Sequence, residues 1–322
     1  MKVSVVIPAY NAERTIGLAV EGALAQGAAV TEVVVSDDGS KDATAEAVRR
    51  YPSAKYIRQE NAGPAAARNA GWRASAGDVV IFTDSDCVPL PGWAERLVAA
   101  LDDPAVGAAT GSYDIKNSYR LLPRLIHEEI KGRHSGYRGE VKFFGSYNVA
   151  IRRKALDETG GFDESYRRAS GEDNDLSYRI LKAGYRIAFV PDALVAHHHT
   201  ERLWKYLREQ YTHGYWRMKL YRDHPDMAGG DDYTRIKDVA EPPLALLSLL
   251  LLPSLPFLPW LASGAAALLF LIQLPAAASA ALRKRCACYL LLAPVTFLRG
   301  YARGLGMLMG TVRFILKAKK VR

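Results

Sequence analysis

The first 100 residues alternate between short apolar runs and amphipathic runs, and this alternation constrains the fold more than any other feature. Runs that are typical of buried strands recur roughly every 25 residues, at Val3–Ile7, Val33–Val35, Tyr56–Ile57 and Val79–Thr83. Residues 13–25, 42–51 and 65–74 between them have the composition and apolar spacing of helices. Because parallel strands need long crossovers, the pattern predicts an α/β fold with a doubly wound, mainly parallel sheet. Pro8 is expected to end the first strand.

The loops after these four strands are polar and should open on one edge of the sheet. They are residues 8–11, 36–40, 59–64 and 84–86. Ligands of open α/β sheets collect beyond the carboxyl ends of the strands, so a nucleotide is expected at this edge. No strand is followed by Gly-x-Gly-x-x-Gly or Gly-x-x-x-x-Gly-Lys-Ser/Thr, which argues against a dinucleotide dehydrogenase or a P-loop enzyme.

Two carboxylates, Asp84 and Asp86, directly follow the fourth strand. Their oxygens suit a hard divalent cation, Mg²⁺ or Mn²⁺, although a capped turn has the same composition. In the other loops, Asp38 can accept hydrogen bonds from a base or ribose, and Tyr10 can stack on a base. Arg68 can pair with a phosphate. A solvated turn, a core aromatic and a surface ion pair are the respective alternatives.

The remainder of the first 200 residues shows less regular patterns. A helix is expected from Trp93, followed by an irregular basic and aromatic segment at residues 113–140. That segment is interpreted as a solvated or membrane-facing insertion rather than a nucleic-acid site, with one wall of an acceptor site as a further possibility. Strands are expected at residues 143–151, interrupted by Gly145-Ser146, and at residues 187–196.

The ordered motifs of the first half resemble the family 2 glycosyltransferases of GT-A fold. The motifs are VSVVIPAYN at residues 3–11, VSDDGSKD at 35–42, NAG at 61–63, ARNAG at 67–71 and DSD at 84–86. The resemblance covers residues 1–200, with Ser36 as a minor departure. It implies a nucleotide-sugar donor (most often a UDP-sugar), a divalent cation on its diphosphate, and inversion at the anomeric carbon. It also implies nucleotide-site roles for Pro8, Tyr10, Asp38 and Asp84, and a metal role for Asp84 and Asp86.

A second acidic motif, Glu172-Asp173-Asn174-Asp175, begins a predicted helix. Acidic residues there are ordinary capping and dipole partners. The string also resembles the Glu-Asp-x-Asp motif of the same family, which implies that Asp173 is the catalytic base. Glu172 and Asp175 would position the base or cap the helix.

The resemblance extends to the metal and acceptor sites. It implies that His197 is a third metal ligand, with a structural or phosphate-contacting role as the alternative. An imidazole ligand favours Mn²⁺ over Mg²⁺. Gly145, Ser146 and Asp175 are assigned to acceptor binding.

The net charge of +9 comes from the end of the chain. Up to Glu241 there are 33 basic and 34 acidic residues, whereas the rest has ten basic residues and no acidic one. A neutral body with a cationic, apolar tail suggests an anionic membrane surface, not nucleic acid, as the partner. The three cysteines form no disulfide framework and fit a reducing compartment. With no secretory signal recognisable, the catalytic part is expected in the cytoplasm.

Three tail segments follow the catalytic domain. Residues 201–241 predict an amphipathic interfacial helix and a linker, and residues 242–282 lack any charge. These 41 residues suit a transmembrane helical hairpin turning near residues 260–264, or one long span followed by a buried helix. Residues 283–322 form a basic amphipathic tail, with residues 286–312 as an interfacial or re-entrant helix. The flanking charges predict that both ends of the hairpin are cytoplasmic.

Together these features predict an inverting, metal-dependent glycosyltransferase of the inner (cytoplasmic) membrane. The expected acceptor is a hydroxyl group of a lipid-linked glycan or a glycolipid. The Gln-x-x-Arg-Trp motif of processive synthases is replaced by QYTHG at residues 210–214, so processive synthesis is disfavoured. A polyprenyl-phosphate acceptor is the alternative reaction. A non-catalytic membrane scaffold that retains the fold is the alternative of another class.

Overall fold

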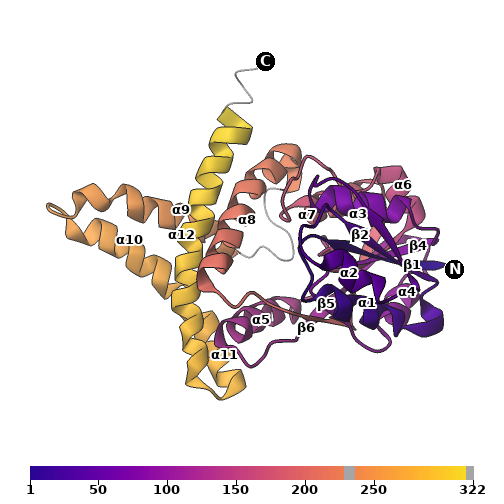
Figure 1. The fold of residues 1–322 in the computed structure, drawn as a ribbon. Coiled ribbons are helices and arrows are strands. Elements are labelled where there is room, and N and C mark those ends of the chain that lie inside the picture. Colours follow the sequence, from indigo (N-terminus) through magenta and orange to yellow (C-terminus); the bar gives the residue numbers. More distant parts are fainter. Residues whose placement is uncertain (228–235, 317–322) are drawn as a thin grey trace. The chain divides into compact units, whose positions relative to one another are not determined.

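The computed structural model of the chain describes residues 1–227 and 236–316, which divide into two compact units. The catalytic unit comprises Met1–Asn117 and His134–His198. The helical unit comprises Ser118–Arg133 and the chain from His199 onward. The chain therefore passes between the units three times. The two parts are coloured by sequence position in Figure 1.

The strands of the described residues form one eight-stranded sheet in the catalytic unit, in the order β3-β2-β1-β4-β7-β6-β8-β5. Their bounds are β1 Val3–Ala9, β2 Glu32–Asp37, β3 Ala54–Arg58, β4 Val79–Thr83, β5 Cys87–Pro89, β6 Val106–Ile115, β7 Asn148–Arg152 and β8 Arg186–His197. The first four strands are parallel, as predicted. The second half is mixed, because β7 runs antiparallel to both β4 and β6. The α/β prediction is confirmed.

Helices of the catalytic unit pack their apolar residues on this sheet (Figure 1). They are α1 Ile16–Leu24, α2 Thr44–Arg49, α3 Pro64–Arg73, α4 Trp93–Ala99, α6 Arg153–Thr159 and α7 Glu172–Lys182. Ile16 and Val20 of α1 are fully buried in the same core as Val5 and Val35 of the sheet. The apolar spacing that predicted these helices is therefore the spacing that buries them.

The prediction that Pro8 ends the first strand is wrong, because β1 continues to Ala9. Pro8 pairs with Ser36 of β2, whereas pairing with β4 stops at Val6. The ring therefore lies where β1 has a neighbour on one side only. Proline is tolerated in such an edge position because no partner needs its missing N–H.

The helical unit contains the predicted tail and one helix from the middle of the chain. Its described helices are α5 Leu121–His134, α8 Leu203–Asp223, α9 Ile236–Leu250, α10 Pro259–Leu271, α11 Leu274–Lys284 and α12 Leu292–Gly310, with a π-helical turn at Thr311–Leu316. α8 and α12 cross closely: a Cβ atom on Gly306 would lie 2.1 Å from the carbonyl oxygen of Tyr211. Only glycine permits this approach of the two backbones.

Two expectations for the second half need correction, and a third stays untested. Residues 113–140 are not irregular, because they contain the end of β6 and the 14-residue helix α5. The expected turn at residues 260–264 lies inside α10, and the chain turns at residues 251–258. The helix expected at residues 286–312 corresponds to α12, which packs within the unit and buries Arg299 completely, and its interfacial or re-entrant placement stays a prediction.

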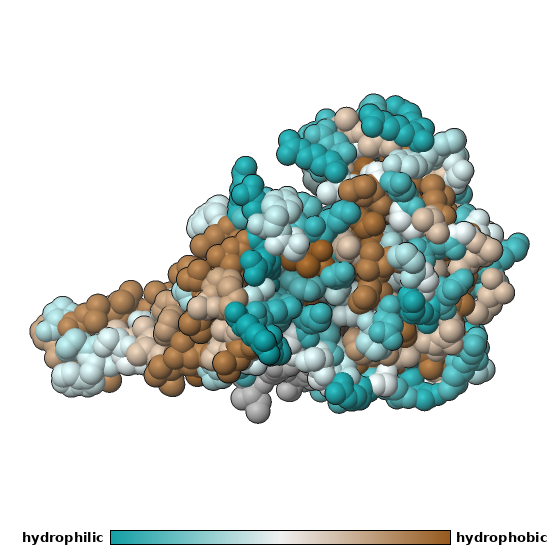
Figure 2. All heavy atoms as spheres, turned by 90° about the horizontal axis from the view of Figure 1, so that it is seen from below, coloured by the Kyte–Doolittle hydropathy of each residue, from teal (hydrophilic) through white to brown (hydrophobic). Residues whose placement is uncertain are grey.

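One stretch of the described residues, Pro259–Lys284, is long and apolar enough to cross a membrane by length and composition. It comprises α10 and α11. In the space-filling view, apolar side chains cover much of the projecting pair of helices α9 and α10 (Figure 2).

Candidate active site

A buried arginine links the two acidic motifs of the catalytic unit. Arg68 in α3 donates from one terminal nitrogen to Asp84, at 2.8 Å, and from the other to Glu172, at 2.9 Å. Its side chain is almost fully buried. Asp84 follows β4, and Glu172 begins α7, 104 residues after Arg68 in the sequence. The Arg68 guanidinium therefore fixes the end of a central strand relative to the start of this helix. Arg68 thus has two carboxylate partners, and its predicted contact with a phosphate stays a prediction.

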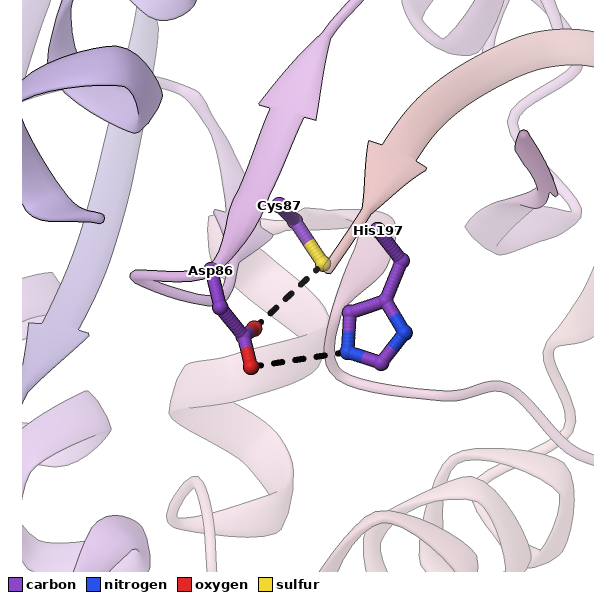
Figure 3. Close-up of side chains that lie close together, drawn as sticks. All are labelled: Asp86, Cys87 and His197. Atoms are coloured by element: carbon purple, nitrogen blue, oxygen red, sulfur yellow. Dashed lines mark hydrogen bonds and ion pairs between the residues drawn. The ribbon is translucent and has the colours of Figure 1, made fainter. Parts of the chain in front are cut away.

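The candidate metal ligands lie where β5 pairs with the end of β8. Cys87 is the register partner of His197, and this places Asp86 beside the imidazole. The Asp86 Oδ2 and His197 Nε2 atoms are 3.5 Å apart (Figure 3). Among the described residues, the ligand atoms of Asp86, Cys87 and His197 all lie within 4.8 Å of one another. A carboxylate oxygen with an imidazole nitrogen is a donor set that fits Mn²⁺.

The remaining members of this region differ from the predicted set. Asp84 is not part of the cluster around His197, since its carboxylate is bound by Arg68. Cys87 lies in the cluster although no role was predicted for it. Burial, followed by the charge of Asp86, raises the pKa of the Cys87 thiol well above its usual value. The thiol is therefore a weaker candidate ligand than Asp86 or His197.

The acidic motif forms the first turn of α7, as predicted. Gly171 precedes the helix with φ of 92°, a left-handed conformation that glycine adopts without strain. Glu172 is buried, and its second oxygen accepts a hydrogen bond from the Ser170 N–H at 2.7 Å. Burial, with a further contribution from the charge of Asp173, raises the pKa of Glu172 to about 7. Asp173 itself is half-buried and stands beside this fixed carboxylate.

The predicted nucleotide residues surround the carboxyl ends of β1 and β2. Tyr10 is about half exposed in the loop after β1, and Pro8 is buried within the strand. The two carboxylate oxygens of Asp38 accept four hydrogen bonds from the loop at residues 59–63. Asp38 therefore orders the loop after β3. Its predicted contact with a base stays a prediction.

The three residues assigned to acceptor binding, Gly145, Ser146 and Asp175, are all buried. Gly145 and Ser146 precede β7. The Asp175 carboxylate accepts two hydrogen bonds from Arg179, which also donates to the carbonyl oxygens of Thr159 and Gly161. Asp175 thus ties α7 to the turn after α6, which is a helix-positioning role.

Sequence reasoning missed two aromatic residues next to the metal candidates. The rings of Tyr113 and Tyr147 are stacked with centroids 3.8 Å apart, and the Tyr113 ring lies 5.1 Å from that of His197. Tyr113 comes from β6 and Tyr147 directly precedes β7, which pairs with β6. No spacing in the sequence signals a contact that depends on strand pairing.

Comparison with known proteins identifies the class. The sequence model of the family described as "Glycosyl transferase family 2" matches residues 4–160, and that described as "Glycosyltransferase like family 2" matches residues 135–226. The chain belongs to the family 2 glycosyltransferases and is an enzyme of that class, as its motifs predicted.

Similar sequences carry glycosyltransferase names. The pre-mycofactocin glycosyltransferase of Mycobacterium tuberculosis is 34% identical over 171 residues, which are 51% of this chain and 36% of that protein. An N-acetylglucosaminyltransferase of Mesorhizobium japonicum is 33% identical over 241 residues, which are 69% of this chain and 56% of that protein. The matches thus cover between about a third and a little over half of these relatives.

Solved structures confirm the fold. A mannosyltransferase from Pyrobaculum calidifontis, in complex with GDP-Man and Mn²⁺, has a TM-score of 0.58 at 23% identity and covers 98% of this chain and 87% of its own. Glucosyl-3-phosphoglycerate synthase from Mycobacterium tuberculosis, in complex with Mn²⁺ and UDP-glucose, has a TM-score of 0.52 at 22% identity, over 69% of this chain and 78% of its own.

Proposed function

We propose that this family 2 glycosyltransferase transfers a sugar from a nucleotide sugar to a hydroxyl group of a lipid-linked glycan or glycolipid, with inversion. The observation that carries the proposal is the Arg68 bridge. By holding Asp84 and Glu172 at once, it keeps the candidate base, Asp173, at the same end of the sheet as the candidate diphosphate site.

The donor would bind across the carboxyl ends of β1, β2 and β4. Tyr10 would stack on the base and Asp38 would contact it, beside the strand end at Pro8. A UDP-sugar is the proposed donor, in line with the family resemblance. Asp86 and His197, with Asp84 nearby, would hold Mn²⁺ or Mg²⁺, and the mixed oxygen and nitrogen donors favour Mn²⁺. When bound, the cation neutralises negative charge on the departing diphosphate.

The transfer itself needs one base. The Asp173 carboxylate would take the proton from the acceptor hydroxyl as its oxygen attacks the anomeric carbon. A single carboxylate acting opposite the leaving group gives inversion, by the logic of inverting glycosidases. Glu172 is held by Arg68, so its proposed part is to position the first turn of α7.

The acceptor would lie beside Gly145, Ser146 and the start of α7, where Asp175 holds the helix in place. A lipid-linked acceptor is supported by the apolar, basic end of the chain, which is proposed to bind the cytoplasmic face of the inner membrane. In this division residues 1–200 are catalytic, and residues 201–241, 242–282 and 283–322 form the interfacial, apolar and basic segments.

A thermal-stability screen of the purified chain tests donor binding. We expect Mn²⁺ with UDP to raise Tm, because a ligand that binds only the folded state stabilises it by about 2.7 kcal/mol at 100 times its Kd. GDP with Mn²⁺ is the matched comparison. Stabilisation by neither nucleotide would contradict the donor proposal.

A donor screen with a membrane lipid extract, read by mass, tests the acceptor. A lipid product heavier by one sugar on a hydroxyl supports the proposal. A product in which the sugar is joined to a polyprenyl phosphate would replace it by the alternative reaction.

A further inference from the structure

The helices α9 and α10 lie side by side and are joined by the turn at residues 251–258 (Figure 1). Large apolar side chains are exposed at and around this turn. Leu250 is 76% exposed, Phe257 81% and Trp260 63%. The projecting pair is correspondingly apolar in the space-filling view (Figure 2). A contiguous exposed surface of this kind marks an interaction site, and a surface without any charge suits lipid chains.

Both ends of the charge-free run are held by the same helix. Before the run, Asp238 is bonded by Arg133 of α5, at 2.7 Å. After the run, Lys284 is bonded by Glu128 of α5, also at 2.7 Å. Arg133 and Glu128 are five residues apart, which is about 7.5 Å along a helix at about 1.5 Å per residue. The run therefore leaves and returns at one place on the helical unit.

The outgoing leg is too short to cross a bilayer. It extends from Pro242 to Leu250, nine residues of α9, or about 13 Å of helix. A hydrocarbon core is about 30 Å thick. The residues immediately before this leg cannot extend it into lipid, because Asp238 and Glu241 are paired with arginines in the protein interior.

The returning leg is longer, but its second half is occupied by protein contacts. Ala277 and Ala280 of α11 are buried in a cluster with Leu125 of α5 and with Leu292 and Ala293 of α12. Of the two helices of this leg, α10, with 13 residues, is the one that runs beside α9. By its length alone, Pro259–Lys284 could cross a membrane. Its packing differs between the two halves, because α11 is in contact with α5 and α12, whereas α10 carries exposed apolar side chains.

We infer that the α9–α10 pair inserts into one leaflet of a lipid bilayer and leaves on the side from which it entered. The tip at Phe257 and Trp260 lies among the acyl chains near mid-bilayer. Arg283 and Arg285, exposed at the end of α11, lie at the anionic head groups. This inference rests on the proposed membrane association, and it replaces the transmembrane hairpin by a re-entrant one.

Cysteine labelling of sealed membrane vesicles tests the depth. The background carries Cys286→Ser and Cys288→Ser, since the third cysteine, Cys87, is fully buried. Phe257→Cys places a thiol at the tip, and Arg14→Cys places the control thiol on an exposed side chain of the catalytic unit. A membrane-impermeant maleimide is applied to right-side-out and to inside-out vesicles.

One-leaflet insertion predicts that the tip thiol is labelled in neither orientation and becomes labelled after detergent. The Arg14→Cys control should react in inside-out vesicles alone. Labelling of the tip from the outer side would overturn the one-leaflet inference while leaving membrane association intact. Labelling of the tip in inside-out vesicles, or release of the protein by alkaline carbonate, would overturn the insertion. Release would leave a surface association of the basic tail with the membrane intact.

A second measurement guards against misfolding of the labelled variants. Leu255→Asp with Phe257→Asp puts two charges at the tip, and we expect the membrane-bound to free ratio to fall at least about tenfold, since charges are costly in the hydrocarbon core. Leu18→Asp with Ala28→Asp is the matched pair of exposed apolar positions in the catalytic unit. An equal loss of binding for the two pairs would contradict the inference.

Discussion

Both the catalytic unit and the helical unit contain a buried arginine that lies between two carboxylates. In the catalytic unit Arg68 bonds Asp84 and Glu172. In the helical unit Arg299 bonds Glu129 of α5 and Glu241 of α9. The partners differ in exposure: the side chain of Asp84 is 33% exposed, whereas those of Glu129 and Glu241 are 12% and 0% exposed.

This difference in exposure separates two uses of the same interaction. Around Arg68, Asp84 is partly exposed and accessible to a ligand, and Asp173 is the sequence neighbour of the other partner, Glu172. Around Arg299, both partners are closed in, so the cluster can only hold α5, α9 and α12 together. A buried ion pair costs desolvation energy in both places, and breaking one is far more costly than replacing all its members.

The largest effect should come from the open end of the catalytic cluster. Asp173→Asn removes the proposed base, and we expect the turnover rate to fall by about 10² to 10⁴. Tm should not change, because the amide fits the same half-buried position. Asp102→Asn, at an exposed carboxylate on the same unit, is the control. Near-normal turnover of Asp173→Asn would favour a phosphate acceptor, which needs no base.

Breaking the closed cluster should reduce stability instead. Arg299→Met leaves Glu241 without its arginine and Glu129 with Arg133 alone, and we expect a loss of about 3–5 kcal/mol, seen as a lower Tm. Adding Glu129→Gln and Glu241→Gln should restore most of that loss, since no unpaired charge is then buried. If the triple variant were as unstable as Arg299→Met, the cost would lie in packing and not in the charges.

Replacing Arg68 and one of its carboxylate partners by uncharged residues tests the difference between the Arg68 and Arg299 clusters. Arg68→Met with Glu172→Gln also removes a buried pair, so Tm should stay close to that of the natural chain. Turnover should nevertheless fall by about 10- to 100-fold, the usual cost of losing a residue that orients a functional group. A variant with unchanged turnover would show that Arg68, like Arg299, only holds the fold.

The smallest effect concerns pH. The pKa of Glu172 is raised to about 7, whereas the usual value for the unfolded chain is 4.5. The folded chain therefore keeps a proton that the unfolded chain has lost between these values, so this contribution to the free energy of unfolding is complete below pH 4.5 and is lost as the pH rises to about 7. Tm measured at pH 5 and pH 7 should differ less in Glu172→Gln than in the natural chain. An equal difference in both proteins would contradict the raised pKa.

Features that depend on local pattern were predictable. The strand at Val79–Thr83 and the helix beginning at Trp93 lie where the sequence placed them. The turn at residues 251–258 also had a local signal, because prolines at positions 253, 256 and 259 interrupt the apolar run. Proline at such spacing favours a break in a helix, and this signal outweighs the Gly264 that suggested the later turn.

Features that depend on distant partners were not predictable from the sequence. α5 had no clear apolar period, because Glu129 and Arg133 are satisfied by residues of α9 and α12 more than 100 positions later. The contacts of Arg68 with Asp84 and Glu172 were not predicted, since no sequence spacing shows that α7 returns to its side.

The sequence by itself determined the family, the order of the motifs and the chemical nature of the site, because these follow from residue types at fixed short spacings. Only the tertiary structure decided that Arg68 joins the two acidic motifs, that Asp86 and not Asp84 lies beside His197, and that α5 belongs to the helical unit. These outcomes depend on which groups come into contact after the chain folds. The free energy of a buried charge depends on whether it has a partner of opposite charge there.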